Sequence, residues 1–136
     1  MSDCVFCKIV LGEIFSFKVF ESENAFAFLD INPASKGHSL VVPKKHFENF
    51  EDVSEQVLKE LILSVQRTAK AVKKAVGCSG FNIFVSNGKS AGQVIFHLHF
   101  HIVPRFENDS VGLNWNTVSF AEKELEQLAL KIKNQF

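Results

Sequence analysis

The sequence predicts an α+β fold, in which a mainly antiparallel sheet is covered on one face by one long helix and is followed by a C-terminal helix. Short apolar runs separated by turn residues predict strands, a long stretch with helical spacing predicts the covering helix, and a run of alternating histidines predicts a further strand. Because the chain has 136 residues, of which 46% are hydrophobic, we expect a single domain over residues 1–136.

The first half of the chain contains three predicted strands. Apolar residues within 9–14 indicate an opening turn of helix or a loop. Residues 17–21 and 25–29 have the composition of strands, and the turn-forming residues between them predict a hairpin. Residues 39–42 are predicted as a short buried strand that ends at Pro43.

A long helix is predicted for residues 54–76. Ser54 is placed as its N-terminal cap and Gly77 as its stop. The apolar residues between them recur at helical spacing: Val57, Leu58, Leu61, Ile62, Val65, Ala69, Val72 and Val76.

Two more strands and a terminal helix complete the prediction. Residues 81–85 and 94–103 have the pattern of strands, and Pro104 is expected to end the second. Ser119 and Glu122 have the spacing of a capping box, and the following residues Leu125, Leu128, Ala129 and Ile132 indicate a helix. The sheet face that the long helix leaves uncovered carries the histidines, so we expect the ligand there.

Composition excludes several classes of protein. Fifteen acidic and fifteen basic side chains cancel, which argues against a nucleic-acid module. No apolar run reaches the length of a membrane span, and the N-terminal residues do not resemble a signal peptide, so we expect a cytoplasmic protein without a membrane partner. Two of the three cysteines form a C-x-x-C motif, which in a reducing compartment indicates metal binding or redox chemistry.

The densest chemical signal is the alternation of His97, His99 and His101. Alternate residues of a strand share a face, so the three imidazoles point one way and the apolar residues between them point the other. A plain half-exposed strand is one interpretation. A shared metal is another, although three alternate positions of a straight strand span roughly 13 Å, which is too far for one ion. The third interpretation is nucleophilic attack at phosphorus, with the glycine-containing loop 87–93 as the cradle for the anion.

This stretch resembles the signature of the histidine triad family of nucleotide hydrolases and transferases. The similarity includes Gly92-Gln93 before the histidines and Pro104-Arg105 after them. Upstream, residues 4–9, 27–33 and 37–46 match further family segments in the family's order. The resemblance covers residues 3–106, and residues 107–136 form a variable C-terminal extension.

The resemblance implies a covalent mechanism. His99 matches the family nucleophile, which attacks the α-phosphorus of a nucleotide and forms a nucleotidyl-histidine intermediate that water cleaves. The backbone carbonyl of His97 would hold the other ring nitrogen of His99. His101 matches the residue that contacts the phosphate and helps to protonate the leaving group, and His38 matches a supporting position beside the active site.

The resemblance also implies a nucleotide site. It places Asn87, Gly92 and Gln93 at the phosphate, and it places Asp30 at the ribose hydroxyls, where the residues alone favour a turn. The apolar clamp on the base would consist of Ile14, Phe28 and Ile31. Val94, beside the phosphate site, is a departure, because many phosphoramidase-type members have serine or threonine there as a donor to the leaving group.

The N-terminal cysteines resemble those of zinc-binding bacterial and protist members of the family. That branch implies a structural zinc ion on Cys4, Cys7, His46 and His97, and no catalytic cofactor. The alternative is a metal-free variant in which the cysteines only pack. Cys78 is expected to be a small apolar filler.

The function that the resemblance implies is cleavage of a P–N or P–O–P bond at the α-phosphate of a purine nucleotide, either a nucleoside phosphoramidate or a dinucleoside polyphosphate. A nucleotide-binding adaptor with incidental hydrolysis and a zinc-dependent hydrolase are the alternatives. Family members commonly form homodimers with joined sheets, so the terminal helix is expected either at an interface or as a cap on its own core.

Overall fold

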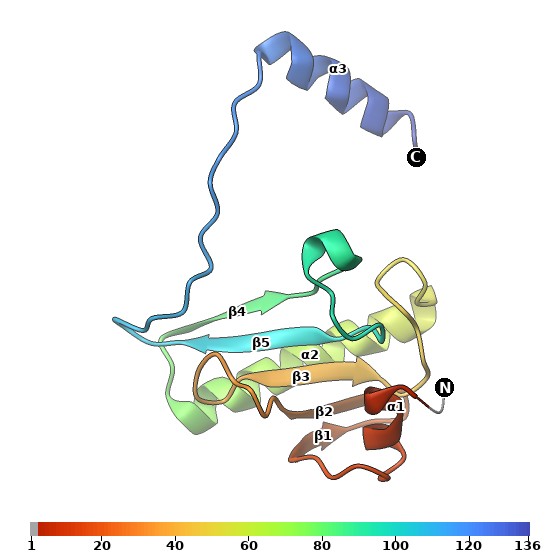
Figure 1. The fold of residues 1–136 in the computed structure, drawn as a ribbon, viewed down its shortest axis with the longest axis vertical. Helices are drawn as coiled ribbons and strands as arrows, with labels where there is room; N and C mark the ends of the chain where they lie inside the picture. The colour runs from red at the N-terminus through yellow and green to blue at the C-terminus, as the bar shows by residue number, and fades with distance from the viewer. Residues whose placement is uncertain (1–2) are drawn as a thin grey trace.

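The computed structural model describes residues 3–136 and contains one five-stranded antiparallel sheet (Figure 1). Its order is β1-β2-β3-β5-β4. The strands are β1 (Lys18–Glu21), β2 (Ala25–Leu29), β3 (Ser39–Pro43), β4 (Gly80–Phe84) and β5 (Phe100–Arg105). The predicted hairpin of β1 and β2 is confirmed. The α+β prediction is confirmed as well.

Helix α2 (Glu55–Val76) covers one face of the sheet, as predicted. The Ser54 hydroxyl accepts a hydrogen bond from the Val57 N–H at 3.4 Å, and Gly77 ends the helix in the left-handed conformation at φ 66°. Leu61, Val65 and other apolar residues of α2 pack against the sheet in the main core cluster. Burial of this apolar face stabilises the domain through the hydrophobic effect.

Helix α1 (Val5–Val10) covers part of the opposite face, which was expected to stay open. Phe6 and Ile9 pack against Phe26, Phe28 and Leu40 in a second apolar cluster. The helix is only six residues long, so it depends on these contacts rather than on its intrinsic helix propensity. The ligand surface is therefore narrower than a bare sheet face.

The histidine strand is shorter at its start than predicted. Strand β5 begins at Phe100, whereas residues 94–99 form an irregular segment. In that segment the Leu98 N–H donates to the Phe47 carbonyl at 2.7 Å rather than to a neighbouring strand. The prediction that Pro104 ends the strand is wrong, because β5 continues to Arg105 and pairs with β4 from His101 to Arg105. Proline is tolerated there because β3 pairs with β5 only as far as Ile102, so no strand needs the missing N–H of Pro104.

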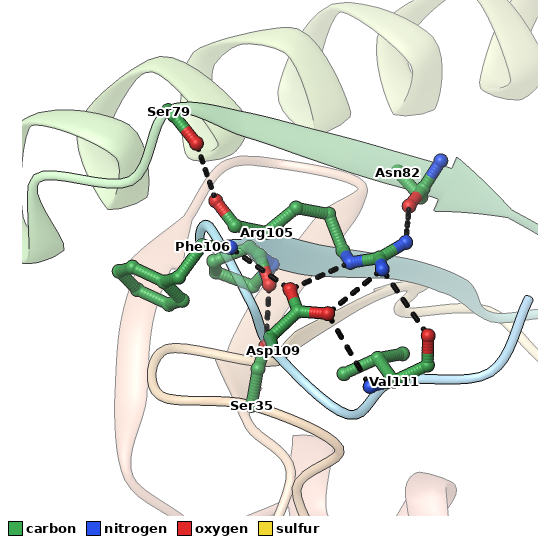
Figure 2. A network of polar contacts seen from close by, with 8 residues as sticks. Ser35, Ser79, Asn82, Arg105, Phe106, Asp109 and Val111 are labelled. Carbon is green, nitrogen blue, oxygen red and sulfur yellow. Dashed lines mark hydrogen bonds and ion pairs between the residues drawn. The ribbon is translucent and has the colours of Figure 1, made fainter.

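The chain after β5 is fixed at its base by a polar network (Figure 2). Arg105 donates two hydrogen bonds to the Asp109 carboxylate at 2.9 and 2.8 Å, and a third to the Asn82 side-chain oxygen at 2.9 Å. Asp109 in turn accepts from the N–H groups of Phe106 and Val111. The direction in which the following segment leaves the sheet is thereby set by side chains.

Helix α3 (Glu122–Lys133) stands apart from the sheet at the end of an extended segment (Figure 1). None of its residues is buried, so of the two alternatives for this helix the one in which it caps its own core is wrong. Its cap residue is Ala121 rather than Ser119, and Glu124 accepts from the Ala121 N–H at 3.3 Å. Within residues 3–136, no helix has the length and apolar character needed to cross a membrane.

Candidate active site

A cavity of about 520 Å³ lies between α1, the loop after β2 and the segment that leads into β5. Eight residues that the sequence predicts for nucleotide binding line it: Ile14, Phe28, Asp30, Ile31, Gly92, Val94, His99 and His101. Apolar side chains make up most of the wall, whereas Asp30 and the two histidines bring polar groups to it. A cavity of this size with few polar groups is typical of a small-molecule site.

His99 is held as a neutral imidazole that faces the cavity. Its Nδ1 lies 2.8 Å from the carbonyl oxygen of His97, and because that oxygen only accepts, Nδ1 carries the proton. The lone pair is therefore on Nε2. The side chain is 8% exposed, and this burial lowers the pKa of His99 below its ordinary value. A neutral ring with a free Nε2 is the form that acts as a nucleophile.

His101 is held in the opposite tautomer. The Ala34 N–H donates to Nδ1 of His38 at 2.9 Å, so neutral His38 carries its proton on Nε2. That proton is donated to Nδ1 of His101, also at 2.9 Å, which leaves the His101 proton on Nε2. Burial and the neighbouring imidazoles lower the pKa of His101 to about 4. The Phe84 ring stacks on His101 with centroids 4.4 Å apart and fixes its plane.

Asp30 makes the contact of a turn residue and also lines the cavity, and its binding to ribose stays a prediction. One carboxylate oxygen accepts from the Asn32 N–H at 2.8 Å, which is the contact expected of a turn residue. The other oxygen lies 3.6 Å from Nε2 of His38, and the residue also lines the cavity. The carboxylate is therefore oriented by the turn and available at the cavity wall.

Asn87 and Gln93 do not line the cavity. The Asn87 side-chain oxygen accepts from the Phe50 N–H at 2.7 Å. The Gln93 amide accepts from the Gly88 N–H at 2.9 Å and donates to the carbonyls of Glu48 and Ile95 at 2.7 and 3.1 Å. Both side chains join the loop before β5 to its surroundings, and their contact with phosphate stays a prediction.

His97 belongs to a separate cluster with Cys4, Cys7 and His46. One ligand atom from each of the four residues lies within 4.8 Å of the others. The Nδ1 atom of His97 lies 3.3 Å from Sγ of Cys4 and 3.5 Å from Sγ of Cys7. Since the ring of His97 faces the cysteines, it shares no ion with His99 and His101.

The cluster fits a metal ion. The Pro43 carbonyl lies 2.8 Å from Nε2 of His97, so Nε2 carries the proton and Nδ1 presents a lone pair to the thiols. Nδ1 of His46 lies 3.4 Å from Sγ of Cys7. Burial and the adjacent Cys4 raise the pKa of the Cys7 thiol to about 11, which a cation would offset. The two sulfur and two nitrogen donors lie close enough together to bind one metal ion.

Among the lining residues that the sequence did not predict are Val5, Phe6 and Ile9 of α1. Their side chains form the wall that faces Phe28, and the ring centroids of Phe6 and Phe28 lie 5.5 Å apart. The available signal was their spacing, since apolar residues one turn apart beside the C-x-x-C motif define one face of a short helix.

Comparison with known proteins agrees with this geometry. A model of the HIT domain matches residues 11–108. An uncharacterized HIT-like protein of Methanocaldococcus jannaschii is 45% identical over 130 residues, which are 96% of this chain and 98% of that protein. The histidine arrangement and these matches define a class, the nucleotide-binding HIT fold. The chain belongs to the HIT family.

Two relatives have names that state an activity. An adenylylsulfatase of Arabidopsis thaliana is 40% identical over 134 residues, covering 98% of this chain and 64% of that protein. An adenosine 5'-monophosphoramidase of Schizosaccharomyces pombe is 37% identical over 133 residues, covering 97% of each. The family thus includes named nucleotide hydrolases.

Solved structures share the whole fold. A Streptococcus mutans protein superposes with a TM-score of 0.94 at 41% identity, covering 99% of this chain and 86% of that one. A zinc-bound histidine triad family protein from Mycobacterium smegmatis has a TM-score of 0.78 at 32% identity, covering 98% and 97%. The long helix and the antiparallel sheet are thus family features.

Proposed function

We propose that the protein cleaves a P–N or P–O–P bond at the α-phosphate of a purine nucleotide, using His99 as a covalent nucleophile. The substrate class is a nucleoside phosphoramidate or a dinucleoside polyphosphate. The observation that carries the proposal is the pairing of His99 Nδ1 with the His97 carbonyl, because it directs the free Nε2 into the cavity.

The proposed reaction has two steps. In the first, the Nε2 lone pair of His99 attacks the α-phosphorus and the bond to the leaving group breaks, while the Nε2–H of His101 donates a hydrogen bond to that group and a water molecule supplies its proton. In the second, water attacks the phosphorus and the P–N bond to His99 breaks. The proton that this water loses balances the one that the leaving group took, and His101 keeps its Nε2 proton throughout. His38 is a positioning residue here, because it fixes which nitrogen of His101 carries the proton.

Substrate binding is assigned to the cavity wall. Asp30 would accept hydrogen bonds from the ribose hydroxyls, and Ile14, Phe28 and Ile31 would enclose the base. The lining residues of the described chain include no lysine or arginine, so imidazole N–H groups and the backbone beside Gly92 would bind the phosphate. The named activities of the Arabidopsis and Schizosaccharomyces relatives support this substrate class.

We assign zinc to the cluster of Cys4, Cys7, His46 and His97. When bound, the ion supplies a structural cross-link between α1 and the residues around it. The zinc-bound Mycobacterium smegmatis relative supports this choice of metal. Because His97 only places its carbonyl beside His99, no step of the reaction uses the metal.

The working form is proposed to be a cytoplasmic homodimer with joined sheets. Strand β4 is an edge of the sheet, and Phe81 and Ile83 on it are exposed. Helix α3 presents Leu125, Leu128 and Ile132 to solvent, and none of its residues is buried. A second copy that covers both surfaces would remove the free edge and bury the apolar stripe.

Replacement of the nucleophile tests the mechanism. We expect His99→Ala to lower kcat for adenosine phosphoramidate by roughly 10³-fold or more, since no other side chain can form the covalent intermediate. Affinity for AMP, measured by calorimetry, should change by less than about threefold because binding rests on the remaining wall. Intact-mass spectrometry of the wild-type protein during turnover should show a nucleotidyl adduct on His99. Retained turnover in the variant would refute the mechanism.

A nucleotide sensor with incidental hydrolysis is the second candidate, favoured by Val94. This residue is 83% exposed at the cavity wall and offers no proton to a leaving group. Single-turnover and steady-state rates on the phosphoramidate separate the two functions. An enzyme would release product repeatedly, whereas a sensor would retain the nucleotide after one event.

A further inference from the structure

Helix α1 lies between the metal cluster and the nucleotide cavity and contacts both. Cys4 and Cys7, at its N-terminal end, bring their sulfur atoms to His97 and His46. Residues of the same turn, Val5 and Phe6, line the cavity. A displacement of this short helix would therefore change the metal cluster and the wall of the nucleotide site together.

His97 makes a second connection between the two sites. Its ring belongs to the cluster, with Nδ1 facing the cysteines and Nε2 bonded to the Pro43 carbonyl. Its main-chain oxygen accepts the Nδ1 proton of His99 at 2.8 Å. The residue is fully buried, so its ring and its carbonyl cannot reorient independently.

Phe6 packs edge-on against both of these histidines. Its ring centroid lies 5.8 Å from that of His97 and 5.1 Å from that of His99, and its ring also contacts Phe28. It is 4% exposed. A single aromatic ring thus contacts a metal ligand, the nucleophile and the base-binding wall.

From these contacts we infer that metal occupancy of the Cys4–Cys7–His46–His97 cluster and nucleotide binding at the cavity are coupled, with Phe6 as the positioning residue that links them. A bound ion holds α1 and His97, and these hold Phe6 and His99 where the nucleotide needs them. Coupling between two sites is reciprocal, so the nucleotide must also stabilise the bound metal by the same factor. The inference rests on the proposed nucleotide function.

The coupling is measured with AMP and Zn²⁺ as probes. Protein is prepared with zinc bound and after chelation, and circular dichroism verifies that both forms keep α2 and the sheet. We expect AMP to bind the chelated form about tenfold more weakly in calorimetry. Saturating AMP should slow the release of zinc to a colorimetric chelator, and the affinity for Zn²⁺ should rise by the factor found for AMP.

Two variants locate the connection. Phe6→Leu keeps an apolar wall but removes the ring that contacts His97 and His99. We expect it to bind one zinc ion per chain, with the coupling reduced to less than about threefold. Phe15→Leu is the matched control. Phe15 lines the same cavity, but its aromatic partner is Phe17 and it lies outside α1, so the coupling should be retained.

The outcomes distinguish this inference from the proposed function. Equal AMP affinity with and without zinc, in folded protein, would overturn the coupling and leave the nucleotide site standing. Absence of AMP binding in both forms would overturn both. A coupling that survives Phe6→Leu unchanged would remove Phe6 from its role.

Discussion

At the scale of single residues, His38, His97, His99 and His101 each have at least one ring nitrogen hydrogen-bonded to a protein partner. The rings of His38, His97 and His99 bond to backbone groups, and His101 bonds to His38. These bonds fix which nitrogen holds a proton and which holds a lone pair. The sequence identified the imidazoles, but their tautomers depend on backbone groups from distant segments, which no local pattern reveals.

The lowered pKa of His101 predicts how stability depends on pH. In the unfolded chain His101 has a pKa of 6.5, whereas in the folded chain its pKa is about 4. Between these two pH values the imidazole is protonated mainly in the unfolded chain. The folded state therefore binds fewer protons in this range, and the free energy of unfolding should fall by up to about 3 kcal/mol as the pH falls. Thermal unfolding followed at several pH values measures this slope. His101→Gln, which keeps polar groups but does not titrate, should have a shallower slope, and an unchanged slope would contradict the assignment.

Val94 predicts a gain of activity. Val94→Ser would place a hydroxyl at the cavity wall, where it can donate to a departing amine. We expect kcat/KM for adenosine phosphoramidate to rise about tenfold, which is the effect of one added hydrogen bond in the transition state. Val94→Ala is the control, because it shortens the side chain without adding a donor. Equal rates for the two variants would show that the leaving group needs no donor at this position.

At the scale of elements, sequence periodicity predicted the long helix and the first hairpin but did not predict the bend in the chain before β5. The long helix and the β1–β2 hairpin follow from local patterns of apolar and turn residues. The bend before β5 does not, because Leu98 bonds to Phe47 from a distant loop. The same bend directs His97 toward the cysteines, so a straight strand would have been unable to form both sites.

Gly37, in the loop between β2 and β3, has a backbone conformation and close neighbours that favour glycine. It has φ +89°, and an added Cβ would lie 3.0 Å from Val76, with Val72 and Pro104 at 3.2 and 3.3 Å. We expect Gly37→Ala to cost about 2 kcal/mol in urea unfolding through strain and crowding. It should also lower kcat, since His38 adjoins it. Gly77→Ala is the matched control, with φ +66° and open space around the added Cβ, and should cost about 1 kcal/mol. Equal costs would mean that crowding against α2 is absent.

At the scale of the whole molecule, the sequence could predict the family and the metal cluster, because those residues form an ordered set of motifs. It could not predict where α3 lies, since the position of a helix depends on the surface that covers its apolar face. In this chain the Arg105–Asp109 network directs the extended segment away from the sheet (Figure 2). Helix α3, at the end of this segment, has no buried residue, which is the physical reason to propose a second copy.

Helix α3 is predicted to hold two copies of the chain together. We expect the full chain to sediment as a dimer of 15.3 kDa chains, and Leu125→Glu combined with Leu128→Glu to raise the dissociation constant by at least roughly 100-fold. The substituted side chains are about half exposed and lie on a helix with no buried residue, so the fold of the monomer is not at risk. Lys123→Glu changes the charge of the helix equally on its opposite face and should leave the dimer intact. If both variants dissociate, charge rather than the apolar stripe controls assembly. If neither does, the copies join without α3.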